Sequence, residues 1–201
     1  MSMRAASHEP QRPLAAVLAG GAGSRIGGTK PATPLGGRAL IAYPLAEAAA
    51  AGLEVVVLAK RDSPLPPLDC EIVLEPDLPR HPLCGILSAL EHADGRAILA
   101  LACDMPFLTA PLLAWLADQP GAAVVELDDR LQPLLARYVP ANRPVLEQAL
   151  ADERSVTSAV QQIAPMRIDA SELARFGNPA RLCFNVNDAA DLAAAERWLS
   201  S

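Results

Sequence analysis

The chain has 201 residues, of which 51% are hydrophobic and 20% charged, the composition of an ordinary globular protein with one substantial core. Disordered, collagen-like and coiled-coil chains have different compositions and are excluded. The 17 Lys and Arg residues are outnumbered by 23 Asp and Glu, and no run of basic residues offsets the net charge of −6. Nucleic acid and anionic membranes are therefore not expected as partners.

The first 13 residues contain no apolar stretch of signal-peptide length, and we interpret them as a disordered N-terminal tail before one domain at 14–201. No segment approaches the roughly 18 uninterrupted apolar residues of a membrane span. The four cysteines form no CxxC pair and have no neighbouring His pair, which argues against a zinc site and a disulfide scaffold. Reduced thiols are the simplest interpretation, so we expect a cytoplasmic protein.

Short apolar runs alternate with amphipathic stretches along the chain. We predict strands at 14–19, 55–59, 71–74, 97–102, 122–127, 132–138 and 166–169. We predict helices at about 39–51, 85–93, 110–116, 144–151, 156–163 and 188–199, with Thr109 as the N-cap of the third. This alternation predicts an α/β fold in which a mostly parallel sheet has helices on both faces. Such sheets bind ligands at the carboxyl ends of their strands.

A glycine-rich segment follows the first predicted strand, with five of the 12 glycines at 20–28. Glycines let backbone N–H groups approach a ligand closely, as in phosphate-binding loops, and Arg25 and Lys30 add positive charge. The dinucleotide pattern G-x-G-x-x-G fails because Ile26 takes the place of its last glycine. The P-loop pattern fails because Thr29 precedes the lysine where glycine is required. A merely flexible turn is the alternative, although flexibility alone needs neither cation.

Two further segments place polar residues after apolar runs. The strand predicted at 97–102 is followed by Asp104, and an acid there can hold Mg²⁺ against a nucleotide phosphate. Helix capping is the alternative role, but Asp104 precedes Thr109 by too many residues to cap the helix that begins there. Near the C-terminus, Asn187 and Asp188 precede the last predicted helix, and either is also suited to be its ordinary N-cap.

Five motifs occur in order along the chain: Leu18 to Gly21 with Arg25, Gly27-Gly28 and Lys30; His81-Pro82-Leu83-Cys84-Gly85; Cys103-Asp104-Met105-Pro106-Phe107; Gln132-Pro133-Leu134; and Asn185-Val186-Asn187. Together they resemble the molybdenum cofactor guanylyltransferases of the MobA-like nucleotidyltransferase family, from about Leu14 to Leu199. Five ordered matches are more specific than any one of them. The resemblance implies a single-domain, Rossmann-like nucleotidyltransferase sheet.

The resemblance also implies transfer of GMP from GTP to the phosphate of molybdopterin, with Mg²⁺ as cofactor and pyrophosphate as leaving group. It implies nucleotide contacts from Leu18, Ala19, Gly20, Gly21, Lys30, Asp77 and Asp104. The implied catalytic residues are Arg25, Lys30 and Asp104, and the implied metal ligands are Asp104 and Asn187. Lys60 falls near a further nucleotide contact without being its usual residue type. For the pterin, the implied contacts are Gln132, Arg154 and Asn185.

Alternatives to this function stay open. Pro31 directly after Lys30 is similar to sugar-phosphate nucleotidyltransferases, so the acceptor could be a sugar or polyol phosphate. Cytidylyl transfer to molybdopterin is a second alternative, and a non-catalytic nucleotide-binding paralogue is a third. Relatives that transfer cytidylyl groups tend to carry Ala at the position of Gly20, where a Cβ would crowd a purine, so we expect GTP to be preferred. A molybdoenzyme or a cofactor-insertion chaperone is a candidate partner.

Overall fold

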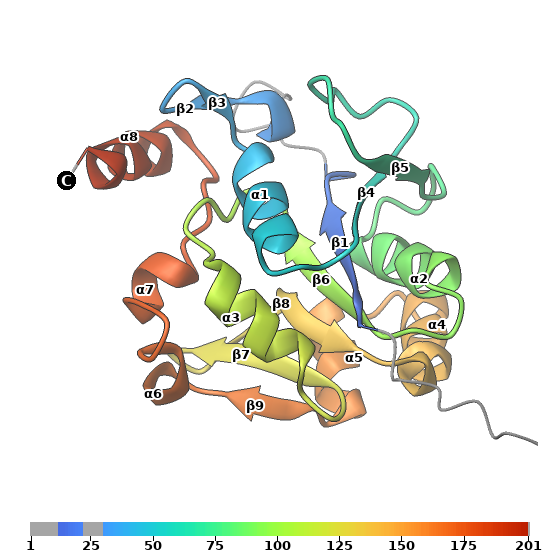
Figure 1. Cartoon of the computed structure of the whole chain (residues 1–201). Coiled ribbons are helices and arrows are strands. Elements are labelled where there is room, and N and C mark those ends of the chain that lie inside the picture. The colour runs from blue at the N-terminus through green and yellow to red at the C-terminus, as the bar shows by residue number, and fades with distance from the viewer. Residues whose placement is uncertain (1–11, 22–29, 201) are drawn as a thin grey trace, which may run out of the picture.

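The structure is a computed structural model that describes residues 12–21 and 30–200. A seven-stranded sheet has the order β5-β4-β1-β6-β8-β7-β9, with helices on both faces (Figure 1). The strands of this sheet are β1 (Leu14–Leu18), β4 (Val55–Ala59), β5 (Glu71–Leu74), β6 (Ile98–Ala102), β7 (Ala123–Leu127), β8 (Arg130–Tyr138) and β9 (Met166–Ile168). The helices are α1 (Ala42–Ala50), α2 (Pro82–His92), α3 (Ala110–Ala117), α4 (Arg143–Ala151), α5 (Val156–Ile163), α6 (Ala170–Leu173), α7 (Pro179–Leu182) and α8 (Ala189–Leu199). The predicted α/β fold with a mainly parallel sheet is confirmed.

Four neighbouring strands, β5, β4, β1 and β6, are parallel to one another. Their register pairs Leu18 at the end of β1 with Leu58 on one side and Ala102 on the other. All four strands therefore end at the same edge of the sheet, and the segments that follow them meet there.

The other half of the sheet departs from the parallel pattern at β8, which runs antiparallel to both β6 and β7. The cause is local, because Asp128 and Asp129 connect β7 directly to β8 with φ angles of 51° and 58°. Positive φ at both central residues suits a two-residue hairpin turn, which matches the twist of antiparallel strands. Without an intervening helix, β8 cannot run parallel to β7.

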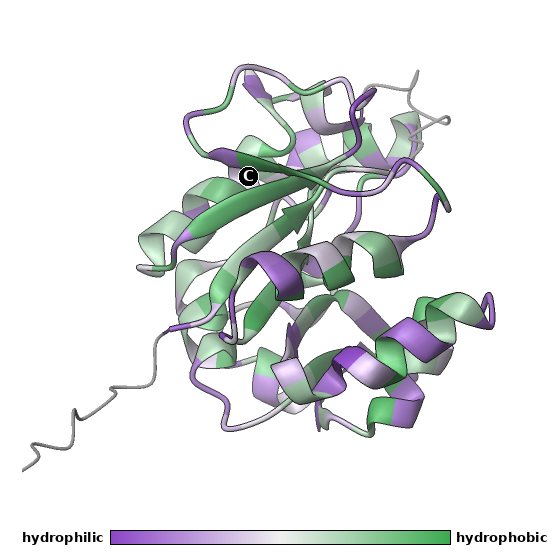
Figure 2. Cartoon of the chain, turned by 90° about the vertical axis from the view of Figure 1, so that its right-hand side faces the viewer, coloured by the Kyte–Doolittle hydropathy of each residue, from purple (hydrophilic) through white to green (hydrophobic). Residues whose placement is uncertain are grey.

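Strand side chains alternate between two buried layers, as the pleat of a sheet requires. Ala15 and Val17 of β1 pack in a core beneath α1 and α3, whereas Leu14 and Ala16 pack in a core beneath α2, α4 and α5. Figure 2 shows the hydrophobic strands lying between helices that carry hydrophilic residues. Because both of their faces are covered, the central strands β1, β4 and β6 are apolar throughout rather than alternating.

Helix α2 begins at Pro82 rather than near residue 85, and α1 and α3 differ from the sequence predictions in their start and their capping, respectively. Helix α1 begins at Ala42 because a small hairpin, β2 (Pro34–Leu35) with β3 (Arg38–Ala39), precedes it. Thr109 occupies the N-cap position of α3 but makes no capping hydrogen bond. Glu47 of α1 instead accepts a 2.7 Å hydrogen bond from the first helical N–H of α3. Short 3₁₀ turns at Lys30–Ala32 and Pro140–Asn142 complete the chain's regular elements in the described ranges.

The ends of the chain pack against this framework in different ways. The predicted tail at 1–13 lies outside the described residues except for Arg12 and Pro13, and Arg12 donates hydrogen bonds to the carbonyl oxygens of Ala51 and Gly52. At the other end, Trp198 of α8 packs on Phe107, with ring centroids 5.4 Å apart. Within residues 12–21 and 30–200, no helix has the length and apolarity to cross a membrane.

Candidate active site

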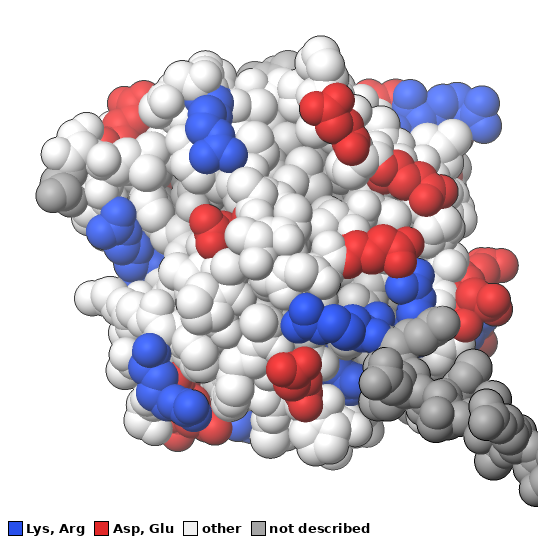
Figure 3. All heavy atoms as spheres, viewed as in Figure 1, with Lys and Arg blue, Asp and Glu red and all other residues white. Residues whose placement is uncertain are grey.

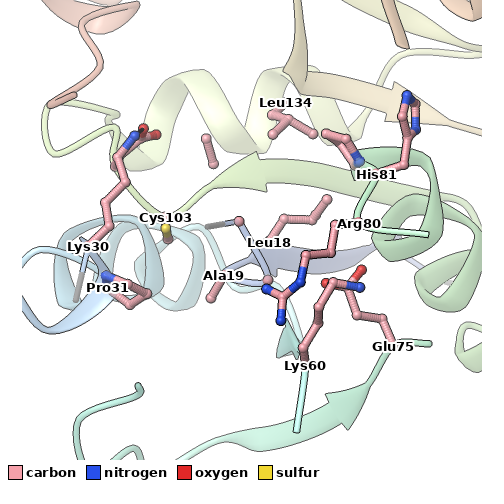
Figure 4. Close-up of a pocket in the computed structure, with 15 residues that line it drawn as sticks. Leu18, Ala19, Lys30, Pro31, Lys60, Glu75, Arg80, His81, Cys103 and Leu134 are labelled. Carbon is pink, nitrogen blue, oxygen red and sulfur yellow. Dashed lines mark ion pairs between the residues drawn. The ribbon is translucent and has the colours of Figure 1, made fainter. Parts of the chain in front are cut away.

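The residues that follow the four parallel strands line one cleft. Gly20 and Asp104 lie just beyond β1 and β6, and Lys60 and Glu75 directly follow β4 and β5. The cleft has a volume of about 240 Å³ (Figure 4). Its other described lining residues are Leu18, Ala19, Gly21, Lys30, Pro31, Arg80, His81, Pro82, Ala102, Cys103 and Leu134. The cleft therefore lies where an α/β sheet of this topology binds its ligands.

Lys30, Asp104 and Asn187 form a polar cluster at one end of the cleft. Lys30 Nζ forms an ion pair with Asp104 Oδ2 and donates a 3.0 Å hydrogen bond to Asn187 Oδ1. The backbone keeps the two acceptors close, because Val186 N donates to the carbonyl oxygen of Asp104 at 2.9 Å. The structure thus brings together three residues that lie far apart in the chain and that the motifs had assigned to one site.

The donor set of this cluster fits Mg²⁺. Asp104 Oδ1 is buried and has no hydrogen-bond partner among the described residues, so one carboxylate oxygen is left to accept a cation. Mg²⁺ prefers one or two protein carboxylates and takes its remaining ligands from water and substrate phosphates. Asp104 and Asn187 supply oxygen ligands of this kind. Asp188 does not join them, because its side chain accepts from Ala190 N and Asp191 N and caps α8.

Cys103 lies beside Asp104 and is not a nucleophile. The residue is only 7% exposed, and burial raises the pKa of its thiol to about 12. A thiol with that pKa stays protonated at neutral pH, whereas the thiolate is the reactive form. Charge in this part of the cleft therefore comes from Lys30 and Asp104.

A second ion pair, between Lys60 and Glu75, lies deeper in the wall of the cleft. Lys60 Nζ is 3.6 Å from Glu75 Oε1, and the side chains of the two residues are only 2% and 5% exposed. Lys60 Nζ also donates a hydrogen bond to the carbonyl oxygen of Pro76. Burial raises the pKa of the Glu75 carboxyl, and the nearby Lys60 ammonium opposes that rise.

Two glycines make room for the Glu75 carboxylate. A Cβ added at Gly20 would lie 1.6 Å from Glu75 Oε1, and one added at Gly85 would lie 2.9 Å from Glu75 Oε2. Both positions therefore exclude any side chain while Glu75 keeps its place. We call the space between Gly20 and Gly85 the glycine notch. It explains why a glycine stands at residue 20 without reference to the size of a nucleobase.

The N-terminus of α2 forms a further part of the cleft wall. His81 Nδ1 accepts a 3.2 Å hydrogen bond from Leu83 N and so caps the helix, and Pro82 is its first residue. The positive end of the helix dipole here favours a bound anion. Arg80 borders the cleft and forms a 2.5 Å ion pair with the exposed Asp62. On the molecular face seen in Figure 3, acidic and basic side chains are interspersed.

The structure sorts the predicted site residues into three groups. Those that line the cleft are Leu18, Ala19, Gly20, Gly21, Lys30 and Asp104, and Asn187 contacts Lys30 beside them. Arg25 lies outside the described residues. The third group does not line the cleft: Arg154 pairs with Asp152 at 3.3 Å, Asn185 Nδ2 donates to the carbonyl oxygen of Cys183, and Gln132 lies on β8.

Asp77 is the one predicted nucleotide contact that the structure moves away from the cleft. Its side chain is exposed and borders shallow surface pockets with Arg61 instead. Glu75 is the acid that reaches the cleft, because it directly follows β5 at the edge where the strands end. The sequence offers a signal for Glu75, because it directly follows a predicted strand, but Asp77 follows the same strand two residues later and the sequence alone does not choose between them.

Comparisons with known proteins agree with the fold. The family model of the MobA-like NTP transferase domain matches residues 15–166. A molybdenum cofactor guanylyltransferase from Cereibacter sphaeroides is 32% identical, over 91% of this chain and 95% of the relative. The crystal structure of molybdopterin-guanine dinucleotide biosynthesis protein A from Archaeoglobus fulgidus has a TM-score of 0.78 and 25% identity, covering 92% of this chain and 98% of that one.

The fold also extends to enzymes with other acceptors. A 2-C-methyl-D-erythritol 4-phosphate cytidylyltransferase from Thermus thermophilus has a TM-score of 0.66 at 20% identity, over 94% of this chain and all of the other. The fold and the cleft thus define a nucleotidyltransferase. More narrowly, the chain belongs to the family of MobA-like NTP transferase domains and is similar over most of its length to molybdenum cofactor guanylyltransferases.

Proposed function

We propose that the protein transfers GMP from GTP to molybdopterin. The terminal phosphate of molybdopterin attacks the α-phosphorus of GTP, a new P–O bond forms there, and the bond to the β-phosphate oxygen breaks. Pyrophosphate leaves and molybdopterin guanine dinucleotide is formed. The attacking phosphate is already anionic, so the protein needs no nucleophile of its own and must position two polyanions and neutralise their charge.

The observation that carries this proposal is the Lys30, Asp104 and Asn187 cluster in the cleft that also contains Gly20. The ammonium of Lys30 suits the β- and γ-phosphates, as a compact point charge. Asp104 and Asn187 would hold Mg²⁺, which supplies charge neutralisation at the reacting phosphates. From the sequence, Arg25 is a further candidate to bind phosphoryl oxygens.

The nucleoside half would lie against the opposite part of the cleft. Leu18, Ala19 and Gly20 present backbone groups at the end of β1. Glu75 supplies a fixed acceptor for N–H or O–H groups of the nucleoside, in place of the predicted Asp77.

The preference for GTP over CTP rests on the similarity to guanylyltransferases. The sequence-based reason for it, that a Cβ at residue 20 would crowd a purine, has a competing explanation in the structure. The side chain that such a Cβ would meet is Glu75, at 1.6 Å. A Gly20→Ala variant would consequently displace Glu75 as well as any base, and its selectivity alone cannot assign Gly20 to base recognition.

We place the reaction in the cytoplasm. All four cysteines are free thiols, and Cys84, Cys103 and Cys183 are buried, which suits a reducing compartment. The finished dinucleotide would pass to a molybdoenzyme or to a chaperone that inserts the cofactor.

The test of this function is pyrophosphate release by the purified protein with Mg²⁺ and each nucleotide–acceptor pair. GTP and CTP are compared with molybdopterin, and glucose 1-phosphate and 2-C-methyl-D-erythritol 4-phosphate serve as alternative acceptors. Turnover with GTP and molybdopterin, together with detection of the guanine dinucleotide product, is the expected result. Turnover with CTP in preference to GTP, or only with a sugar or polyol phosphate, would overturn the assignment.

A further inference from the structure

The ion pair of Lys60 and Glu75 is enclosed by other parts of the chain more closely than charge neutralisation alone requires. Glu75 is held from three sides: by Lys60, by the backbone at Gly20 and by the start of α2 at Gly85. Lys60 is held in turn, because its ammonium also donates to the carbonyl oxygen of Pro76, the residue after Glu75. A carboxylate enclosed in this way is restricted to a narrow range of positions relative to the end of β1.

We propose that Lys60 is a positioning residue, which fixes the Glu75 carboxylate in the glycine notch so that the cleft presents an ionised, correctly oriented acceptor to the nucleoside half of the nucleotide. Lys60 acts through Glu75 and does not itself contact the nucleotide. This inference adds detail to the proposed function. It requires only one part of that proposal, that the cleft binds a nucleotide.

Burial makes this arrangement depend on the lysine. A carboxyl group in an apolar environment favours its neutral form, and an adjacent cation restores the charged form. Lys60 lies at the end of β4 and is the cation 3.6 Å from Glu75. The other titratable groups that face this region are Cys84 on α2 and, in the cleft wall, Arg80 and His81. Arg61, Asp77 and Glu91 line a neighbouring surface pocket together with Glu75. Arg80 has a carboxylate partner of its own in Asp62.

The position of Lys60 also argues against a direct phosphate contact. Its ammonium faces Glu75 Oε1 and the carbonyl oxygen of Pro76 in the cleft wall, whereas the Lys30 side chain, at the opposite end of the cleft, is 19% exposed. Figure 4 shows the Lys60 and Glu75 side chains together, away from Lys30. A phosphate-binding ammonium must reach its ligand, and Lys30 is placed to do so.

The test measures the dissociation constants of GTP and GMP, without any acceptor, for the wild type, Lys60→Met, Glu75→Gln and the double variant between about pH 6 and about pH 9. Near neutral pH we expect Lys60→Met and Glu75→Gln each to weaken both nucleotides about tenfold to a hundredfold, the range for a lost hydrogen bond to a charged group. Lys60→Met should regain affinity as the pH rises and Glu75 ionises. Glu75→Gln should not regain it.

The double variant is the decisive control, because it leaves neither a buried carboxylate nor a buried ammonium without its partner. It should bind nucleotide no more weakly than Glu75→Gln alone, since Lys60 acts only through Glu75. Any pH dependence that persists in the double variant does not come from Glu75 and is subtracted. Circular dichroism and thermal unfolding show which variants fold, and if Lys60→Met does not, the comparison of Glu75→Gln with the double variant still decides.

Three results would overturn the proposal: wild-type affinity in Lys60→Met at every pH, a further loss of affinity when Lys60 is removed from Glu75→Gln, or a larger loss for GTP than for GMP. The last two would mean that the ammonium contacts the nucleotide or its phosphates directly. Because no acceptor is present, these outcomes do not depend on whether molybdopterin is the substrate.

Discussion

The chain contains only two lysines, and each pairs with a carboxylate at a different end of the same cleft. The side chains of Lys30 and Asp104 are 19% and 10% exposed, and one oxygen of Asp104 has no partner among the described residues. The side chains of Lys60 and Glu75 are 2% and 5% exposed and are enclosed by two glycines. Lys30 and Asp104 can therefore exchange partners, whereas the enclosed pair of Lys60 and Glu75 is expected to keep its contact.

Under the proposed function, this difference in exposure gives the two ion pairs different roles. Phosphoryl transfer needs a cation at the triphosphate, and Lys30 can turn from Asp104 to the phosphates because Mg²⁺ would take its place on the carboxylate. A buried pair is costly to separate, since removing either partner leaves an uncompensated charge. We therefore place the reacting phosphates at the Lys30 end and the fixed recognition of the nucleoside at the Lys60 end.

Removing Asp104 is expected to have the largest effect of the changes considered. Asp104→Ala should lower the rate of pyrophosphate release about a hundredfold, or about 3 kcal/mol in the barrier, because the proposed Mg²⁺ would lose its carboxylate ligand. The rate is measured at saturating Mg²⁺ and GTP. Asp152→Ala, which removes an acid from a surface pair outside the cleft, is the matched control and should keep the wild-type rate. Wild-type turnover in Asp104→Ala would mean that this acid is only structural.

The glycine notch makes the next prediction, which concerns stability. Gly20→Ala should lower the free energy of unfolding by about 1–3 kcal/mol, because its Cβ would overlap Glu75 Oε1 in a closely packed site. Gly21→Ala is the control, since no described atom lies within 4 Å of a Cβ there. Urea unfolding of both variants measures the difference.

Combining Gly20→Ala with Glu75→Ala tests the cause of that loss. If the notch exists to hold Glu75, the double variant should lose less stability than the sum of the two single changes, because the carboxylate no longer occupies the space. Additive losses would show that the alanine is poorly tolerated at residue 20 for a different reason.

The fold was predictable because its central strands β1, β4 and β6 are apolar throughout and its main helices fill the stretches between the strands. Periodicity located β1, β4, β5 and β6 to within a residue at each end. It could not locate the β2–β3 hairpin, whose two-residue strands are too short to show a period. The capping of α3 could not be predicted from neighbouring residues, because the first N–H of the helix donates to Glu47, which is distant in sequence.

The site was predictable where a residue lies within a motif at a strand end, as for Gly20, Lys30 and Asp104. It was not predictable where tertiary packing chooses between neighbouring candidates. Asp77 and Glu75 are both acids after β5, and only the three-dimensional path of the chain shows that Glu75 enters the cleft. Similarly, no residue near Lys60 in the sequence indicates that its side chain is buried, because the burial results from its packing beside Glu75 in the glycine notch.

Lys30 provides a prediction of intermediate size. In Lys30→Ala we expect GTP affinity to fall about tenfold and GMP affinity to change little, because the ammonium meets the β- and γ-phosphates that GMP lacks. Isothermal titration calorimetry measures both nucleotides. Equal losses for GTP and GMP would move Lys30 away from the terminal phosphates and would weaken the distinction between the two pairs.

The same variant should behave differently toward the metal. With no nucleotide present, the ammonium of Lys30 contacts both Asp104 and Asn187, the two oxygen donors that we assign to Mg²⁺. Lys30→Ala should therefore bind Mn²⁺, a substitute for Mg²⁺, about threefold to tenfold more tightly than the wild type does. Electron paramagnetic resonance measures the Mn²⁺ binding. Weaker Mn²⁺ binding in Lys30→Ala would show that the lysine supports the metal site rather than occupying it.

The smallest effect is expected at Asp77, and it separates the sequence-based assignment from the structural one. Asp77 is exposed and does not line the cleft, so Asp77→Asn should change the free energy of unfolding by less than about 0.5 kcal/mol. It should also change the dissociation constant of GTP by less than about twofold. Glu75→Gln, which removes the same charge two residues earlier, is the matched comparison and should weaken GTP strongly. If Asp77→Asn weakened GTP as much as Glu75→Gln does, Asp77 would have to enter the cleft when nucleotide binds, and the fixed acceptor at the Lys60 end would be assigned to the wrong acid.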